Sequence, residues 1–225
     1  MIVAIDGPAG AGKSTVARAV ADALGIGYLD TGAMYRALTL MALRDGVAVS
    51  DGPALADLAR RHPVELANGP GGVRVHVRGD DVTMAIREGD VTGAVSEVAA
   101  HPAVRHEMVA RQREIMRHGD WVCDGRDIGS VVFPEAEVKV FLTASVDERA
   151  RRRHAELVAR GERVDLREIR DDVERRDLAD SSRAASPLVV AEGAEVVDTT
   201  GAGDLFAAGF LAGWTQGRNL HDCGR

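Results

Sequence analysis

The sequence predicts an α/β fold in which helices flank a parallel sheet on both faces. Apolar runs of strand type alternate with helical stretches, and the clearest runs are Ile2–Asp6, Trp121–Asp124, Val138–Thr143 and Glu195–Asp198. Such alternation is typical of βαβ units, whose strands are parallel. Aspartates close several strands: Asp6, Asp30, Asp124 and Asp198. Since ligands of these folds bind at the carboxyl ends of the strands, we expect the site there.

The first strand leads into a glycine-rich loop. Residues 7–14 read G-P-A-G-A-G-K-S, which is a complete phosphate-loop motif, and residues 15–24 form an Ala-rich helical segment. A loop between a strand and a helix directs backbone N–H groups and the positive end of the helix dipole toward one point. Lys13 suits the β and γ phosphates of a nucleoside triphosphate, and the Ser14 hydroxyl suits Mg²⁺.

Composition narrows the class of protein. With 225 residues, 45% hydrophobic and 28% charged, the chain is typical of a soluble globular protein with one large domain, or a core with a small insertion. A net charge of −7 argues against a nucleic-acid partner. The sequence has no apolar run long enough for a bilayer, so we expect no membrane partner. Its two cysteines form no disulfide framework, and a cytoplasmic location is expected.

The segment from about residue 62 to 92 breaks the strand–helix alternation. Residues 64–66 and 73–77 alternate apolar and polar side chains, and N-G-P-G-G lies between them at 68–72. This pattern predicts a β-hairpin, and antiparallel strands inside a parallel chain predict a small inserted subdomain. Charged or Arg-rich helices are then predicted over residues 102–118, 144–160 and 166–178.

Four further segments point to a second anion beside the phosphate loop. At 30–36, a strand end and a glycine turn are expected to lead into a helix that directs Thr31 and Arg36 toward this anion. The other segments are Asp124–Asp127, the helix with Arg149, Arg152 and Arg153, and residues 175–188. Phosphoryl transfer between two nucleotides crowds several phosphates together, and converging arginines neutralise them. Taken singly, each arginine fits a solvated helix face better than a functional role, and it is their recurrence at strand ends and turns that favours a site.

Together these motifs resemble the bacterial cytidylate kinase family over residues 1 to about 200. The specific segments are GPAGAGKST, LDTGAMYRA, ARQRE at 110–114, DGRDIGSVVFPEAEVKVFLTAS and RRDLADSSRAASPL. The resemblance implies a P-loop nucleoside monophosphate kinase with a monophosphate-binding region at about 31–118 and a short lid at about 149–183. It implies transfer of the γ-phosphate of ATP, with Mg²⁺, to CMP or dCMP in pyrimidine nucleotide metabolism. We expect a monomer.

The resemblance also implies roles for individual residues. The ATP phosphates would be held by Gly7, Pro8, Ala9, Gly10, Ala11, Gly12, Lys13, Ser14 and Thr15, with Ser14 on the metal. The CMP phosphate would be bound by Arg36, Arg126 and Arg183. The cytosine would face Ser96, Arg111 and Asp127, and Thr31 would line the same site. The sugar hydroxyls would contact Arg176 and Asp180. The lid arm over ATP would carry Arg149, Arg152 and Arg153, and the catalytic charges would be Lys13, Arg126, Arg152 and Arg153.

Some of these roles have alternatives. Ser96 could be a serine on a helix surface, and Asp124 either reaches Mg²⁺ through water or only orients Arg126. A carboxylate, a guanidinium and a hydroxyl suit cytosine, whose N4 amine donates while O2 and N3 accept. No general base is needed, because the acceptor phosphate is already ionised near neutral pH. The sequence does not distinguish ribose from deoxyribose.

The C-terminal tail departs from this family. Residues 198–209 read D-T-T-G-A-G-D-L-F-A-A-G, which resembles the final signature of the ribokinase-like carbohydrate kinases, with Asp204 at the catalytic position. The sheet domain that this signature needs is not visible upstream. We therefore expect a substitute C-terminal helix capped near Asp204. Three alternatives remain: a kinase of another monophosphate such as UMP, an inactive nucleotide-binding chimera, and a sugar kinase.

Overall fold

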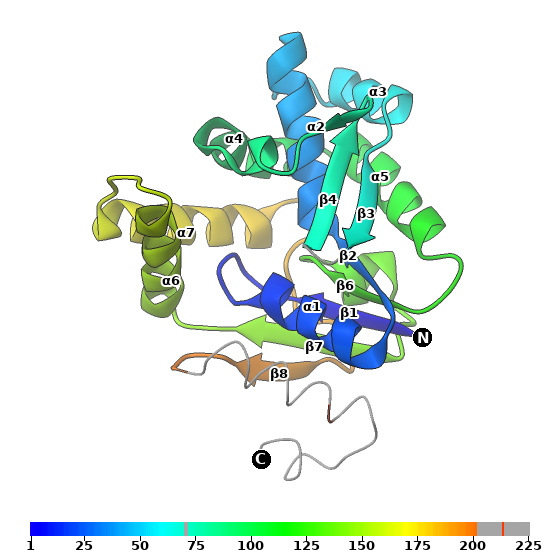
Figure 1. The fold of residues 1–225 in the computed structure, drawn as a ribbon, viewed down its shortest axis with the longest axis vertical. Coiled ribbons are helices and arrows are strands. Elements are labelled where there is room, and N and C mark those ends of the chain that lie inside the picture. Colours follow the sequence, from blue (N-terminus) through cyan, green and yellow to red (C-terminus); the bar gives the residue numbers. More distant parts are fainter. Residues whose placement is uncertain (70–71, 202–212, 214–225) are drawn as a thin grey trace.

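The computed structural model describes residues 1–69, 72–201 and 213 (Figure 1). Its main sheet has the strand order β2-β6-β1-β7-β8, and all four neighbouring pairs are parallel. The strands are β1 Ile2–Asp6, β2 Gly27–Asp30, β6 Trp121–Asp124, β7 Val138–Thr143 and β8 Glu195–Asp198. The predicted parallel sheet is confirmed, and the four runs singled out in the sequence are four of its strands.

Both faces of the sheet are covered, so its central strand is apolar on both sides. Val3 and Ile5 of β1 pack in one cluster with Val16 and Val20 of α1 (Lys13–Leu24). Ala4, between them, faces the other cluster, which is built around α2 (Thr31–Asp45). This is the period-two alternation of a strand, and it places α1 and α2 on opposite faces.

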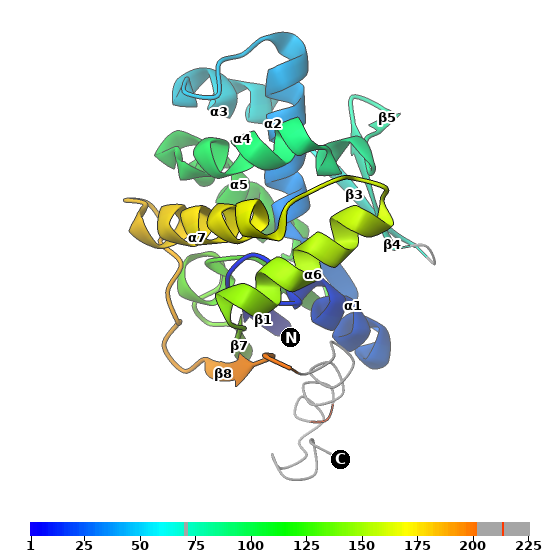
Figure 2. The same ribbon diagram turned by 90° about the vertical axis from the view of Figure 1, so that its left-hand side faces the viewer.

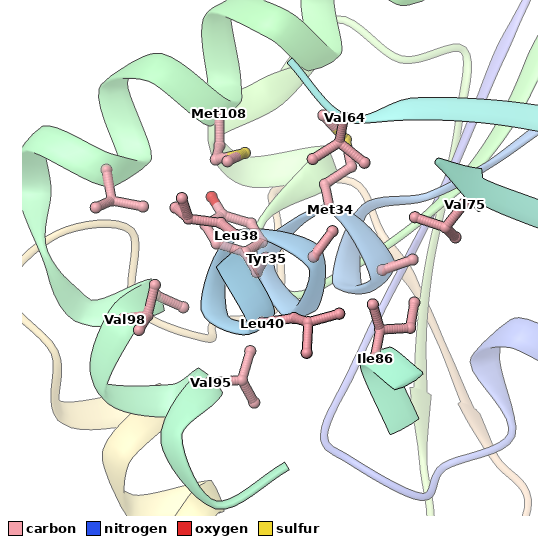
Figure 3. Packing of buried hydrophobic residues seen from close by; sticks show 14 of the residues in the cluster. Met34, Tyr35, Leu38, Leu40, Val64, Val75, Ile86, Val95, Val98 and Met108 are labelled. Carbon is pink, nitrogen blue, oxygen red and sulfur yellow. The ribbon is translucent and has the colours of Figure 1, made fainter. Parts of the chain in front are cut away.

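Helix α2 is the centre of the larger core (Figure 3). Its side chains Met34, Tyr35 and Leu38 point into a cluster with residues from several other elements: Val64, Val75, Ile86, Val95, Val98 and Met108. Those elements include η1 (Ala85–Arg87), α4 (Gly89–Ala100) and α5 (Pro102–Ile115); α3 (Gly52–Arg61) packs on α5 and α2. The sequence predicted a helix after residue 30, which is α2, and the Arg-rich helix that is α5; it gave no bounds for α3, η1 or α4.

The predicted hairpin is present as part of a second sheet. β3 (Glu65–Gly69), β4 (Gly72–Val77) and β5 (Asp80–Asp81) pair antiparallel in that order. Val75 and Val77 of β4 are buried in the core around α2, so the hairpin is attached to the helix that follows β2 (Figure 1). Turn residues 70 and 71 lie outside the described part of the chain.

Helices α6 (Val146–Ala159) and α7 (Leu166–Ser182) form a pair near the carboxyl ends of the main strands (Figures 1 and 2). A small cluster of Ala150, Ile169 and Val173 joins them. Helix α7 continues past the expected end at residue 178. The hydroxyls of Ser181 and Ser182 donate to the carbonyls of Asp177 and Leu178, at 2.7 and 2.6 Å, so both serines bond back to the preceding turn.

One local expectation was wrong. No glycine turn separates β2 from α2: the helix begins at Thr31 itself, capped by the Asp30 carboxylate, which accepts from Ala33 N at 2.9 Å. An aspartate at the N-cap satisfies a helix N–H that has no partner within the helix. The predicted C-terminal helix and Asp204 lie outside the described residues. Among the described helices, none has the length and apolar character needed to span a membrane.

Candidate active site

The phosphate loop lies between β1 and α1, and close neighbours require its glycines. Gly7 has a φ of 145°, and a Cβ atom there would lie 1.9 Å from Leu142 O, so glycine alone fits. Gly10 and Gly12 also have positive φ, at 77° and 88°. The sharply turned backbone leads directly into the N-terminus of α1, which favours bound anions.

Lys13 is buried at the first turn of α1. Its Nζ donates to Pro8 O at 2.7 Å, which places the ammonium within the loop. Burial, followed by the charge of Arg126, lowers the pKa of Lys13 to about 7, and the charge of Asp124 opposes the shift. A buried ammonium with this few partners gains most from an arriving polyanion, so it suits the phosphates of a nucleotide.

Ser14 and Asp124 form the oxygen pair that could hold Mg²⁺. Ser14 Oγ donates to Asp124 Oδ2 at 2.9 Å, and Tyr28 OH donates to Oδ1 at 2.8 Å. Burial, followed by the charge of Asp30, raises the pKa of Asp124 to about 6. A hydroxyl and a carboxylate fit Mg²⁺, which takes its remaining ligands from water and phosphate oxygens. The described residues contain no metal-binding group of three or more acidic, His or Cys side chains.

A cavity of about 680 Å³ opens in front of this loop. Gly10, Lys13 and Ser14 line it on the loop side, and arginines from α1, α2, η1, the β6 end, α6 and α7 surround the rest. These arginines are Arg18, Arg36, Arg87, Arg126, Arg152, Arg153, Arg160 and Arg176. Convergent guanidinium groups of this kind bind phosphates through charge-assisted hydrogen bonds.

A smaller pocket of about 80 Å³ adjoins the cavity and shares Arg36, Arg126 and Arg176 with it. Its other polar lining comes from α2, α4, α5, α7 and the segment after β6. The side chains are Thr31, Tyr35, Ser96, Arg105, Asp127, Asp180 and Arg183. The structure therefore brings together Thr31, Ser96 and Asp127, which the sequence analysis placed around one base. The Thr31 hydroxyl donates to Asp124 O at 2.7 Å.

Arg111 does not reach this pocket, contrary to expectation. It is exposed on α5 and lines neither cavity, whereas Arg105 on the same helix is buried. Arg105 forms a short ion pair with Asp127 and donates to Ala99 O at 3.2 Å. The guanidinium also lies over the Tyr35 ring, 5.4 Å from its centroid. Arg105 is thus the guanidinium from α5 in this pocket, and sequence reasoning missed it.

A signal for Arg105 was present in the helix periodicity. Arg105, Met108 and Gln112 follow at intervals of three and four, and all three are buried on one face of α5. Positions spaced in this way share a helix face. Arg111 lies off that face, so counting from Met108 would have favoured Arg105.

The arginines expected to bind the acceptor phosphate surround the border between the two cavities. Arg126 Nε donates to Asp180 Oδ2 at 2.8 Å. Burial alone would raise the pKa of Asp180, but the hydrogen bond and charge of Arg126, together with the charges of Arg183 and Arg176, outweigh it and the pKa is lowered. Arg36 donates to Thr92 Oγ1 at 3.0 Å; burial, followed by the charge of Arg176, lowers its pKa to about 10. Arg183 Nη1 lies 3.6 Å from Asp180 Oδ1.

The expected lid arginines separate into two kinds. Arg152 and Arg153 line the large cavity, with Arg152 bonded to Glu148 and Thr199 and Arg153 to Glu156. Arg149 does not line it: this side chain is buried beneath the loop and paired with Asp177. It was expected over ATP, and in this structure it contacts the phosphate loop through Ala9 O.

Asp6 is a site residue for which the sequence suggested no role. Its carboxylate accepts from Ile128 N at 2.8 Å and Gly129 N at 2.7 Å, and thereby holds the start of η2 (Ile128–Val132) directly after Asp127. Burial raises the pKa of Asp6 to about 6, although the two N–H groups lower it in part. The end of β1 is thus fixed to the loop that carries Arg126 and Asp127.

Comparison with known proteins gives the family of the chain. The sequence profile of the family described as cytidylate kinase matches residues 3–204. A cytidylate kinase of Geobacillus sp. (strain WCH70) is 55% identical over 198 residues, which are 88% of each chain. The cytidylate kinase of Shouchella clausii (strain KSM-K16) is 51% identical over 201 residues, 89% of each chain. A solved structure of an uncharacterized Eubacterium ventriosum protein, 12% identical, shares the fold with a TM-score of 0.52, covering 97% of this chain and 99% of that one.

Proposed function

The chain belongs to the cytidylate kinase family, and we propose that it transfers the γ-phosphoryl group of ATP to CMP or dCMP within the two adjoining cavities. As a member of this family it phosphorylates CMP. The site assignment rests on one observation. An arginine-lined cavity at the phosphate loop adjoins a smaller pocket, and this pocket contains the buried Arg105–Asp127 pair.

The larger cavity is assigned to ATP. The loop from Gly7 to Thr15 would surround the phosphates with N–H groups, and Lys13 would neutralise the β and γ oxygens. Ser14 would hold Mg²⁺, with Asp124 reached through water, because the two side chains are already hydrogen-bonded. Mg²⁺, when bound, would neutralise charge on the transferring group. Arg152 and Arg153 would approach the triphosphate from α6.

The border between the cavities is assigned to the acceptor phosphate. Arg36, Arg126 and Arg183 would bind it, and the adjacent Arg176 and Asp180 would contact the sugar hydroxyls. Such convergence places an acceptor oxygen beside the γ-phosphate, and positioning of this kind supplies most of the catalysis in phosphoryl transfer. That oxygen is ionised near neutral pH, so an in-line displacement needs no general base.

The smaller pocket is assigned to the base. The Asp127 carboxylate would accept from the N4 amine of cytosine, and Arg105 and Ser96 would donate to N3 and O2. Uracil presents an acceptor where cytosine has the amine, so it would face the carboxylate with no proton to share. A site built on buried polar partners discriminates strongly against such analogues.

The division into regions follows from these assignments. Residues 31–118 would form the monophosphate-binding region and 149–183 the lid, both belonging to one kinase domain over 1–200. The monomeric state, a cytoplasmic location and the structural role of the tail at 201–225 stay predictions. A sugar-kinase role of Asp204 has no support from the described residues.

A coupled assay of ADP formation tests the proposal. Wild-type protein with Mg²⁺ and ATP is offered CMP, dCMP, UMP and AMP in turn, with ribose and fructose as sugar acceptors. We expect CMP or dCMP to give the highest kcat/KM, about 10²-fold or more above UMP, because mismatched polar partners are left unpaired. Equal or higher activity with UMP, or CMP binding without turnover, would contradict it.

A further inference from the structure

Arg149 is the most deeply buried charged group of the α6–α7 pair. It lies in the first turn of α6 and is 3% exposed. The Arg149 Cβ lies only 3.1 Å from where a Cβ on Gly10 would be, so the side chain is packed directly against the phosphate loop. None of the functions assigned above uses this guanidinium.

The guanidinium of Arg149 joins three separate segments. Nη1 donates to Ala9 O in the phosphate loop at 3.1 Å, and Nε donates to Ala144 O, just before α6, at 2.9 Å. Nη1 and Nη2 also form a bidentate pair with the Asp177 carboxylate of α7, at 2.9 and 2.6 Å. A planar guanidinium with five donors can hold all three, whereas an ammonium cannot reproduce this geometry.

Asp177 lies between residues that face the acceptor. Arg176 lines both cavities, and Asp180, one turn further along α7, holds Arg126. A displacement of α7 would therefore move Arg176 and Asp180 together. Arg149 hydrogen-bonds both to this helix, at Asp177, and to the carbonyl of Ala9 in the phosphate loop.

We propose that Arg149 and Asp177 are positioning residues that couple ATP binding at the phosphate loop to CMP binding at α7. This inference rests on the proposed function of the two cavities. When the loop closes on phosphates, the Ala9–Arg149–Asp177 connection holds α7 where Arg176 and Asp180 meet the acceptor. Coupling between two sites requires a structural element whose position both ligands favour, and α7 is that element.

The test measures how the ATP site changes CMP affinity. The Kd of CMP is determined by calorimetry without and with a saturating, non-hydrolysable ATP analogue and Mg²⁺. For wild-type protein we expect the analogue to tighten CMP binding at least about 5-fold, the lower end of usual coupling. In Asp177→Asn we expect this ratio to fall toward one, while CMP affinity without the analogue stays within about 3-fold, because Asp177 does not line the acceptor pocket.

Asp147→Asn is the matched control. Asp147 also joins α6 to α7, through Arg170 Nε at 2.9 Å, but this pair is exposed (67% and 46%) and does not contact the loop. The same substitution there should leave the coupling ratio unchanged. Arg149→Lys is the second variant: it keeps the charge but cannot bridge Ala9 and Asp177, so its ratio should also fall. Thermal unfolding of each variant confirms that folded protein is measured.

The outcomes separate this inference from the proposed function. Wild-type protein that fails to bind CMP contradicts the function itself. If wild-type protein turns CMP over but the analogue leaves CMP affinity unchanged, the coupling proposal is wrong, and no variant is needed for that result. Full coupling in folded Asp177→Asn or Arg149→Lys, or an equal loss in Asp147→Asn, overturns it as well.

Discussion

The donor and acceptor halves of the site are constructed differently. The donor half is one contiguous segment, Gly7 to Thr15, whose shape comes from backbone conformation and a helix N-terminus. The acceptor half takes its side chains from α2, α4, α5, α7 and the end of β6. A site made by backbone is specified locally, because glycine positions dictate it. A site made by dispersed side chains exists only once the helices have packed.

The two halves also differ in how charge is held before ligands arrive. In the acceptor half, buried arginines are paired with carboxylates, as in Arg105–Asp127 and Arg126–Asp180. In the donor half, Lys13 has among the described residues only a carbonyl as its hydrogen-bond partner, and burial lowers its pKa. Paired guanidiniums are oriented in advance, whereas Lys13 depends on the arriving phosphates for its counter-charge.

The largest expected effect is in the donor half. Lys13→Ala should lower kcat by roughly 10²-fold or more, because a preorganised charge on the transferring group is lost. Lys139→Ala is the control, since Lys139 is the only other lysine and donates to Glu192 O away from both cavities. Steady-state kinetics and a thermal unfolding curve decide the matter. Near-normal turnover in folded Lys13→Ala would remove the loop from the donor site.

In the acceptor half, Arg126→Ala should act on CMP rather than on ATP. We expect kcat/KM for CMP to fall by about 10- to 10²-fold, since a charge-assisted contact to phosphate is lost and Asp180 is left without its closest partner. Binding of ATP alone should change little. A variant that loses ATP affinity and keeps CMP affinity would place Arg126 in the other half. Arg183→Ala should behave in the same direction.

The difference between the halves explains what the sequence could predict. The phosphate loop and four strands followed from local patterns, because apolar β-branched runs and fixed glycine spacings carry the information. No bounds were predicted for helix α4, although it supplies Ser96 to the base pocket. Its apolar positions are mixed with Gly, Thr and Ser, which weaken a helix pattern.

Individual side chains of the acceptor half were harder to predict. Arg105 and Arg111 lie on one Arg-rich helix, and only tertiary packing decides which of them is buried. Arg149 carries the same charge as Arg152 and Arg153 in neighbouring positions, yet it faces the loop while they face the cavity. The roles of Asp6 and Asp177 depend on partners more than a hundred residues away or on another helix, which no local pattern reveals.

The smallest predicted effect concerns Asp6, which connects the end of β1 beside the phosphate loop to the segment that follows Asp127. Asp6→Asn should lower the free energy of unfolding by about 1–3 kcal/mol, because an amide has one acceptor oxygen and leaves one of two buried N–H groups unpaired. Chemical denaturation at pH 7 measures this change. An Asp6→Asn protein as stable as wild type would show that the two hydrogen bonds contribute little.

The pH dependence of stability sharpens the same prediction. The pKa of Asp6 is raised from 3.8 to about 6 on folding, so the folded state binds the proton more tightly than the unfolded state. The stability linked to this group is therefore complete below about pH 4 and is lost as pH rises to about 6. In Asp6→Asn this part of the decline should disappear. An unchanged slope in the variant would assign the decline to other carboxyl groups.

The central claim is that packing, and not local sequence, defines the acceptor half. The most direct measurement compares Arg105→Ala with Arg111→Ala, two substitutions of one kind on one helix. We predict that Arg105→Ala lowers kcat/KM for CMP by about 10- to 10²-fold and reduces the preference for CMP over UMP, since Asp127 loses its partner. Arg111→Ala should stay within about twofold of wild type, as surface substitutions do. The opposite result, loss in Arg111→Ala with normal kinetics in Arg105→Ala, would contradict the account.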